Sequence, residues 1–433
     1  MRDIAISVAI LGFLPVAIWR PWVGVMLWVW VSLMAPHHFA WGFAQEMPFA
    51  AAIAGATLIG LFVTRDRIHF PATPVTITLA LFAGWMTVTF LFALEPEQAY
   101  PRWKEVMKVI AFIFVTMLAL HDRKHIKWLL WVIVISVGYY GVKGGLFTIV
   151  TGGGSKVYGP PGDTYISDNN AIAVALVMVI PLMYYLAITS TSRLLKIGLM
   201  LSMVLSGAAV LGSQSRGAFL AIIAGCAFLW LHSRKKLFVG ALVVVALPFA
   251  IVMMPDSWKN RMRTIETYEA DSSSMGRINA WKMAINLAND RPLVGGGFEM
   301  YSRNTFDRYA PDPEDVHAAH SIYFQILGEH GYVGLGLFLL ILIFAWRTAT
   351  KLIEKSHERP DWEWAGEMAR AVQVSLVGFF VGGAFINIAY WDLQYYEIAL
   401  LVIATRLLGE EAGQPVAQTA VTGQPRQSGV GSG

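Results

Sequence analysis

Residues 195–232 read LKIGLMLSMVLSGAAVLGSQSRGAFLAIIAGCAFLWLH and decide the fold class. Two apolar runs, residues 195–212 and 218–232, flank a short polar turn. This turn, residues 213–217, reads Ser-Gln-Ser-Arg-Gly and contains Arg216. Apolar runs of roughly 17 to 25 residues recur along nearly the whole chain, each long enough to cross a hydrocarbon core of about 30 Å as a helix. The pattern predicts an all-α polytopic membrane protein.

Composition agrees with this prediction. Of the 433 residues, 56% are hydrophobic and 14% are charged, whereas soluble domains average about 25% charged residues. The predicted spans cover residues 4–18, 22–34, 48–64, 74–94, 103–120, 127–150, 170–188, 195–212, 218–232, 237–254, 322–346, 371–391 and 395–408.

The longest polar stretch interrupts these spans. We expect transmembrane helices over residues 1–254, a large extramembrane loop over residues 255–321, transmembrane helices over residues 322–408, and a disordered cytoplasmic tail over residues 409–433. The loop ends in His317, His320 and Ser321, immediately before an apolar run. A histidine at the boundary between water and lipid indicates chemistry on a lipid-borne substrate.

Two further features narrow the class of protein. The first apolar run continues into Arg20-Pro21 and a second run without a small-residue cleavage site, so no cleavable signal is expected. The single cysteine, Cys226, lies in an apolar run and excludes a disulfide.

The basic residues of short loops predict an orientation. The loops with Arg65 and Arg67, at residues 121–127, with Arg193 and Lys196, and at residues 233–236 should face the cytoplasm. Residues 95–100, 151–168, 213–216 and the large loop then lie on the opposite, periplasmic face. If residues 4–34 cross once, broken at Arg20-Pro21, there are twelve spans and both termini are cytoplasmic. If they cross twice, there are thirteen spans.

Arg216 is a candidate phosphate ligand, since it lies at the predicted start of a helix, where backbone N–H groups also favour anions. The alternative interpretation is that the Arg216 side chain only extends to the lipid headgroups. Arg277 and Trp281 share one face of a predicted helix in the large loop. Arg277 is either a second diphosphate ligand or part of an interfacial helix anchored by Trp281.

The run Arg-Pro-Leu-Val-Gly-Gly-Gly-Phe, residues 291–298, resembles a phosphate loop only in its glycine count. It lacks the Gly-Lys-Ser/Thr ending and predicts a turn that lets the chain pack closely.

His320 is the candidate base, because a neutral imidazole can accept a hydroxyl proton near pH 7. His317 lies three residues earlier, and spacing alone does not choose between them. A zinc pair is the weaker interpretation, because Asp312, Glu314 and Asp315 are not placed as further ligands.

Basic residues in other predicted spans are candidate substrate contacts, since charge at membrane depth is costly. Lys104 and Lys108 share a helix face below Arg102, and Lys143 lies within another span. Asp168 is expected to cap the helix that follows it.

These residues carry a family resemblance. The chain resembles the O-antigen ligases (WaaL) and the wider O-antigen ligase and polymerase superfamily of bacterial envelope glycosyltransferases. Three motifs carry it: residues 213–217; Arg277, Trp281, Pro292 and the glycines 295–297; and His320-Ser321 followed by residues 327–331 and Gly334. The N-terminal pattern around Arg20-Pro21 and residues 35–37 also resembles ligase-like proteins found with exopolysaccharide export systems.

The resemblance implies a GT-C-type enzyme of the bacterial inner membrane with about twelve spans and a periplasmic site. The implied donor is a glycan on undecaprenyl diphosphate, and the implied acceptor is a sugar hydroxyl of lipid A–core. Arg216 and Arg277 would hold the diphosphate, assisted by Lys108 or Arg102, and His320 would act on the acceptor in an inverting displacement. No metal, cofactor or nucleic acid is expected, and membrane lipids surround the protein.

Three alternatives stay open at this point. A polymerase uses the same donor with a second lipid-linked glycan as acceptor, and a protein O-glycosylation ligase uses a protein hydroxyl. A lipid or glycan transporter would use the basic residues as a translocation path, and its activity would survive loss of His320.

Overall fold

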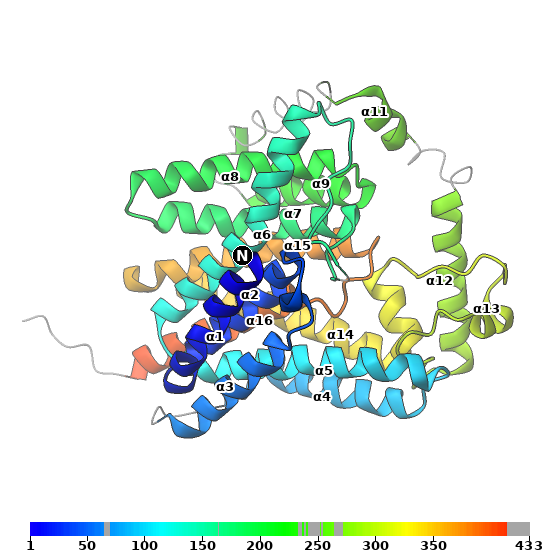
Figure 1. Cartoon of the computed structure of the whole chain (residues 1–433), viewed down its shortest axis with the longest axis horizontal. Helices are drawn as coiled ribbons and strands as arrows, with labels where there is room; N and C mark the ends of the chain where they lie inside the picture. The colour runs from blue at the N-terminus through cyan, green and yellow to red at the C-terminus, as the bar shows by residue number, and fades with distance from the viewer. Residues whose placement is uncertain are drawn as a thin grey trace, which may run out of the picture.

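The computed structural model describes residues 1–64, 70–162, 164–232, 236, 237, 240, 252, 254–263 and 272–413. Within these residues every regular element is a helix (Figure 1). Six of the described helices are long and apolar enough to cross a membrane: α1 (Arg2–Trp19), α4 (Pro74–Leu91), α6 (Arg123–Val150), α7 (Asn169–Thr189), α8 (Arg193–Gly212) and α14 (Ile322–Lys355). The architecture is that of an all-helical polytopic membrane protein.

Shorter or more polar helices complete the bundle: α2 (Pro21–Met34), α3 (Phe49–Val63), α5 (Pro96–Ala119), α9 (Arg216–His232), α15 (Glu363–Gly383) and α16 (Asp392–Gly413). The predicted loops at Arg65 and Arg67 and at 233–236, and the predicted span 237–254, fall largely outside the described residues.

The first two helices form an antiparallel hairpin. Asp3, in the first turn of α1, accepts hydrogen bonds from the backbone N–H groups of Gly42 (3.0 Å) and Ala44 (3.2 Å), which follow α2. Arg20 leaves helical geometry, with φ −135° and ψ 88°, and Pro21 begins α2 at a position where its missing N–H is not needed. Of the two alternatives that the sequence left open, the structure therefore favours two separate helices over one span interrupted at Arg20-Pro21.

Small residues allow α6 and α8 to pack closely. A Cβ on Gly145 would lie 2.1 Å from the carbonyl oxygen of Leu205, and one on Gly141 would lie 2.2 Å from Ser206 Oγ. Helices in lipid associate through such close backbone approach, because lipid tails are as apolar as the side chains. Lys143, between these two glycines, is exposed.

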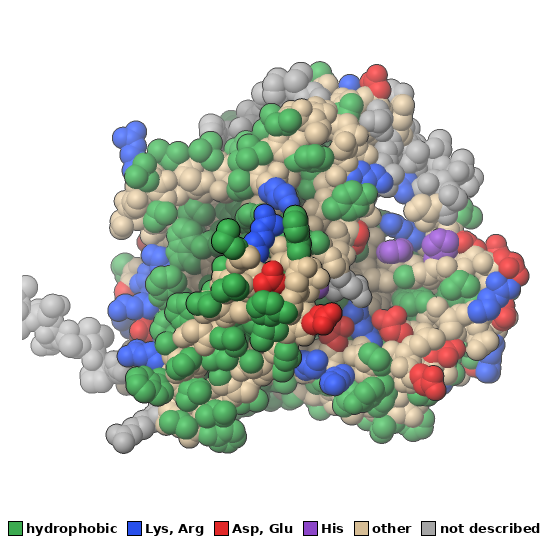
Figure 2. Space-filling model, in the orientation of Figure 1, with side chains coloured by type: hydrophobic (Ala, Val, Ile, Leu, Met, Phe, Trp, Pro, Cys, Tyr) green, Lys and Arg blue, Asp and Glu red, His purple; other side chains and the backbone are tan. Residues whose placement is uncertain are grey.

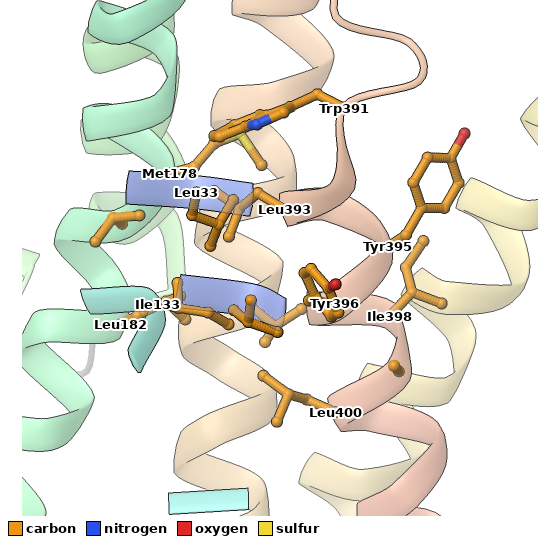
Figure 3. Close-up of a cluster of buried hydrophobic side chains, with 14 of the residues drawn as sticks. Leu33, Ile133, Met178, Leu182, Trp391, Leu393, Tyr395, Tyr396, Ile398 and Leu400 are labelled. Atoms are coloured by element: carbon orange, nitrogen blue, oxygen red, sulfur yellow. The ribbon is translucent and has the colours of Figure 1, made fainter. Parts of the chain in front are cut away.

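The core lies where α2, α6, α7 and α16 meet. Figure 3 shows Leu33, Ile133, Met178 and Leu182 on one side of this core, facing the Trp391 side chain and the side chains of α16. Leu33 is 1% exposed, and Ile133, Met178 and Leu182 are fully buried. Helix α16 is buried along most of its length, so it is the central helix of the bundle.

Two sets of loops gather at opposite ends of the bundle. At one end, Arg406 donates to the carbonyl oxygen of Met117 (2.9 Å), and Trp22 stacks on His125 with ring centroids 4.8 Å apart. At the other end, the N–H of Leu94 donates to the carbonyl of Gly296 (2.8 Å). This separation matches the predicted division of the loops into two faces.

Helices α12 (Ser272–Asp290) and α13 (Arg303–Tyr309) of the large loop form a lobe at the right of Figure 1. Helix α11 (Asp256–Arg263) lies apart from this lobe, at the top of the figure, where Trp258 donates to the carbonyl oxygen of Leu211 (3.0 Å). Apolar side chains of α12, α13 and the segment between them form their own buried cluster: Ala280, Met283, Ala284, Leu287, Met300, Phe306 and Tyr309. The α12–α13 lobe is thus a folded unit.

Several predicted boundaries are wrong: α5 begins at Pro96 and not at residue 103, and α14 ends at Lys355 and not at residue 346. The span predicted at residues 371–391 ends eight residues early, because α15 stops at Gly383 and residues 384–391 form a loop. The tail is predicted as disordered from Gly409, but residues 409–413 belong to α16, and the rest of the predicted tail lies outside the described residues. Glu411 accepts a hydrogen bond from Trp362 (2.9 Å), which stabilises this last turn.

Candidate active site

Arg216 begins α9, as its sequence context predicts. Gln214 adopts a left-handed φ of 57°, and its side chain donates to the carbonyl oxygen of Gly153 (3.2 Å). Ser215 Oγ accepts the N–H of Ala218 (3.3 Å) and so caps the helix. The turn therefore presents the Arg216 side chain beside the positive end of a 17-residue helix.

Arg277 reaches the same place from α12. Its Nη1 donates to the carbonyl oxygen of Phe385, 3.4 Å away. A small cavity is lined by both arginines, together with Asn170, Val174, Ser215, Gly217, Gly382, Phe385 and Ile386. Its volume of about 20 Å³ suffices for about one water molecule, so a larger ligand would have to widen it. The two arginines are far apart in the sequence, yet both line one cavity.

His320 is held in an uncommon backbone conformation. Its φ is 44°, in the left-handed region that costs a residue with a side chain about 1–3 kcal/mol. Trp281 Nε1 donates to the carbonyl oxygen of Ala319 (2.6 Å), and Asn387 Oδ1 accepts the N–H of Ser321 (3.1 Å). Hydrogen bonds on both sides of His320 therefore fix its position.

We call Arg216 and Arg277 together the clamp. Arg277 contributes to the electrostatic surroundings of His320. Burial lowers the pKa of His320 to about 4, and the positive charge of Arg277 acts in the same direction, while Asp168 opposes both. The imidazole is therefore neutral at pH 7 and able to accept a proton.

The loop at residues 384–391 joins the parts of this site. Phe385 accepts the hydrogen bond from Arg277, and Asn387 accepts the one from Ser321. A Cβ on Gly217 would lie 2.9 Å from Phe385 Cβ, so a glycine next to Arg216 lets α9 approach the same loop. One loop therefore sets the distances among Arg216, Arg277 and His320.

A buried polar network holds this loop through Tyr390. His330 pairs with Thr89 Oγ1 through Nδ1 (2.6 Å) and with the Tyr390 hydroxyl through Nε2 (2.7 Å). The Tyr390 hydroxyl also donates to Glu329. His330 and Thr89 are fully buried, and Tyr390 and Glu329 are each 1% exposed. The network connects α4 and α14 to the loop that carries Phe385 and Asn387.

The glycine-rich turn at residues 291–298 packs closely against α14, as predicted. The N–H groups of Gly296 and Gly297 donate to the carbonyls of Gly328 (2.8 Å) and Glu329 (2.9 Å). Helix α14 breaks at Gly331, where φ is 67° and ψ is −169°. The turn thus satisfies carbonyl groups that the break leaves without helical partners.

The structure does not bring every candidate residue to the cavity. Lys104, Lys108 and Lys143 are exposed, and none of them lines the cavity shared by the arginines. Lys143 instead lies with its Nζ 6.0 Å from the centre of the Phe39 ring.

Arg102 belongs to a different group of residues. It packs over the ring of Tyr165 at 4.5 Å, pairs with Glu105 at 3.0 Å, and lies 3.5 Å from Glu299. These partners already balance its charge, so it does not extend the clamp of Arg216 and Arg277.

The remaining candidates lie around His320. Trp281 is half-buried and stacks on Phe324 with ring centroids 4.9 Å apart. Ser321 is 1% exposed, and its Oγ has no hydrogen-bond partner among the described residues. His317 is exposed and bonds Asp315. The described residues contain no group of three metal-ligating side chains. Asp168 caps α7, as predicted, by accepting the N–H of Asn170 (2.7 Å).

Several residues of the site were not singled out from the sequence. Phe385, Asn387 and Tyr390 lie inside an apolar run that predicts a membrane helix. Asn387 is the only strongly polar side chain in residues 384–391, and this was the available signal. Asn279, which holds the chain before His317, carried no signal beyond helical spacing.

Comparison with known protein families adds an independent observation. Residues 1–191 match a family of unknown function (DUF5935), and no curated protein matches the chain. Residues 201–339 run from α8 to the middle of α14 and include Arg216, Arg277 and His320, but not the loop at residues 384–391. This segment matches the family described as O-antigen ligase, which supports a place for the chain in the O-antigen ligase and polymerase superfamily.

Proposed function

We propose that the protein is an O-antigen ligase of the bacterial inner membrane. It transfers a glycan from undecaprenyl diphosphate to a sugar hydroxyl of lipid A–core on the periplasmic face. The observation that carries this proposal is the convergence of Arg216 and Arg277 on one cavity, whose loop at residues 384–391 also holds the backbone next to His320 through Asn387. The family match over residues 201–339 supports the reaction class.

The arginines suit a diphosphate leaving group. Guanidinium groups form paired, charge-assisted hydrogen bonds with phosphate oxygens. As the bond between the anomeric carbon and the phosphate oxygen breaks, its electron pair leaves with the diphosphate. Arg216 and Arg277 would stabilise that growing negative charge. The diphosphate leaves readily, so the step requires no general acid and no divalent cation.

His320 suits the other side of the reaction. The acceptor hydroxyl oxygen forms the new bond to the anomeric carbon while its proton passes to the imidazole. An imidazole with a pKa near 4 is a weak base in the empty site. A bound diphosphate would offset the charge of Arg277, raise the pKa of His320, and so make proton transfer easier. Direct displacement inverts the anomeric carbon.

The test uses purified full-length protein with undecaprenyl-diphosphate glycan and lipid A–core, in EDTA, with the products separated on a gel. We expect glycan on lipid A–core, and its loss in His320→Ala. A strict metal requirement would contradict the mechanism.

The same assay separates the alternatives. Lengthening of the lipid-linked glycan with donor alone would replace the ligase by a polymerase. Transfer only to a protein hydroxyl would replace lipid A–core as the acceptor. Movement of donor across vesicles by His320→Ala, without transfer, would indicate a transporter.

A further inference from the structure

A second, wider depression lies at the start of α12. It is lined by Ser273, Met275, Asp315 and His317 and encloses about 440 Å³, a size typical of small-molecule sites. Figure 2 shows histidine side chains at the edge of the hollow between the helical bundle and the α12–α13 lobe, with Lys or Arg side chains nearby. We call the surface formed by these four residues the α12 groove.

Asp315 and His317 form a fixed pair in this groove. His317 Nδ1 lies 2.7 Å from Asp315 Oδ1, while the side chains remain 46% and 34% exposed. Asn279 anchors the backbone beneath the pair by donating to the carbonyl oxygens of Asp312 (2.7 Å) and Asp315 (3.0 Å). The pair is therefore positioned before any ligand arrives, and it stays accessible.

The groove adjoins the clamp. A Cβ on Gly276 would lie 3.0 Å from His317 Nδ1 and 3.1 Å from Asp315 Oδ2, so the pair sits against the residue that precedes Arg277. His317 also precedes His320 by only three residues in the same loop. A ligand in the groove is thus next to both the clamp and the candidate base.

The lining selects a class of ligand. A carboxylate, an imidazole and a hydroxyl supply hydrogen bonds to hydroxyl groups, and Met275, which is 43% exposed, offers an apolar surface. No described lysine or arginine lines the groove, in contrast to the cavity with Arg216 and Arg277. The groove suits an uncharged, hydroxyl-rich molecule, and the cavity suits an anion.

We propose that the α12 groove binds the acceptor sugar, with Asp315 and His317 holding its hydroxyl groups so that one of them reaches His320. This inference rests on the proposed function, since it assigns the acceptor side of the same reaction. It divides the site into one half that binds the anionic donor and another half that binds the hydroxyl-rich acceptor.

The first test measures binding without turnover. Full-length protein in nanodiscs is mixed with lipid-free core oligosaccharide, and saturation-transfer NMR reports contact with the sugar. We expect binding by the wild type, and its loss in Asp315→Asn and His317→Gln. Asp307→Asn is the matched control, because Asp307 lies on the same lobe, pairs with Arg303 at the surface, and does not line the groove.

The second test separates binding from chemistry. In transfer assays, Asp315→Asn should raise the KM for acceptor about tenfold or more, as expected for loss of a hydrogen bond to a charged group, while kcat and the KM for donor change little. Gly276→Ala should raise the acceptor KM in the same way, because its methyl group would displace the pair.

The outcomes distinguish this inference from the proposed function. Sugar binding that survives Asp315→Asn and His317→Gln, or a wild type that does not bind the oligosaccharide, would overturn the α12 groove even if transfer occurs. Binding that depends on the pair, without transfer to lipid A–core, would support the groove and count against the ligase. Binding only of a hydroxyl-bearing peptide would overturn the assignment to a sugar.

Discussion

The guanidinium of Arg277 and the carbonyl oxygen of Phe385 lie 3.4 Å apart although 108 positions separate the two residues. The contact joins the α12–α13 lobe to the loop between α15 and α16. Arg277 therefore owes its position to the membrane helices as well as to α12.

Replacement of Arg277 by Lys should lower kcat/KM by about 100-fold or more, because an ammonium group does not reproduce two-point binding of phosphate oxygens. The transfer assay with lipid-linked donor measures this loss. Arg303→Lys is the control, since Arg303 pairs with Glu314 on the lobe surface and should keep full activity. Full activity in Arg277→Lys would remove Arg277 from the clamp.

Asn387→Ala should lower kcat about tenfold and leave the KM for donor nearly unchanged. The substitution removes the acceptor for the Ser321 N–H and so loosens His320, and a displaced catalytic group loses rate more than binding. Steady-state kinetics with varied donor give both constants. Asn289→Ala, which removes a surface hydrogen bond from Tyr332, should behave like the wild type. An equal change in both variants would contradict a positioning role for Asn387.

The pH dependence should reveal the buried histidine. Burial, together with Arg277, lowers the pKa of His320 from 6.5 to about 4, so the neutral base persists at lower pH than for an ordinary histidine. The value of kcat/KM should hold as the pH falls below 6.5 and decline only as it approaches about 4. An acidic decline centred near 6.5 would mean that another histidine controls the reaction.

Gly295→Ala should destabilise the protein more than Gly152→Ala. Both glycines have left-handed φ values, 61° and 59°, so both alanines carry similar backbone strain. A Cβ at Gly295 would lie 2.4 Å from the carbonyl oxygen of Gly328, whereas one at Gly152 meets no atom within 4 Å. Apparent melting temperatures in detergent compare the two variants. Equal shifts would show that the contact with α14 is not needed for stability.

The sequence predicts the general architecture because apolar length is a strong signal in membrane proteins. Most spans begin and end within a few residues of the predicted positions, and Arg216 lies at a helix start as expected. The prediction fails at residues 384–391, where an apolar composition hides a loop. Its apolar side chains are buried by neighbouring helices, and buried loops and buried helices need the same side chains.

The site was predictable only in part. Arg216, Arg277 and His320 stand out because charge near an apolar run is costly. Lys108 and Lys143 carry the same signal, yet they face outward, because sequence spacing does not say which face of a helix points inward. The roles of Asn387 and Tyr390 depend on contacts between distant segments, which no local pattern records.

The hairpin of α1 and α2 has a consequence for the whole molecule. It returns the chain to the start of α1, where Asp3 holds the residues that follow α2, while α16 ends at the other end of the bundle, beside the end of α5. The first and last described helices therefore begin and end at opposite ends of the bundle. If the bundle spans a membrane, we expect a reporter fused ahead of Arg2 and one fused after Gly413 to give signals from opposite sides of it.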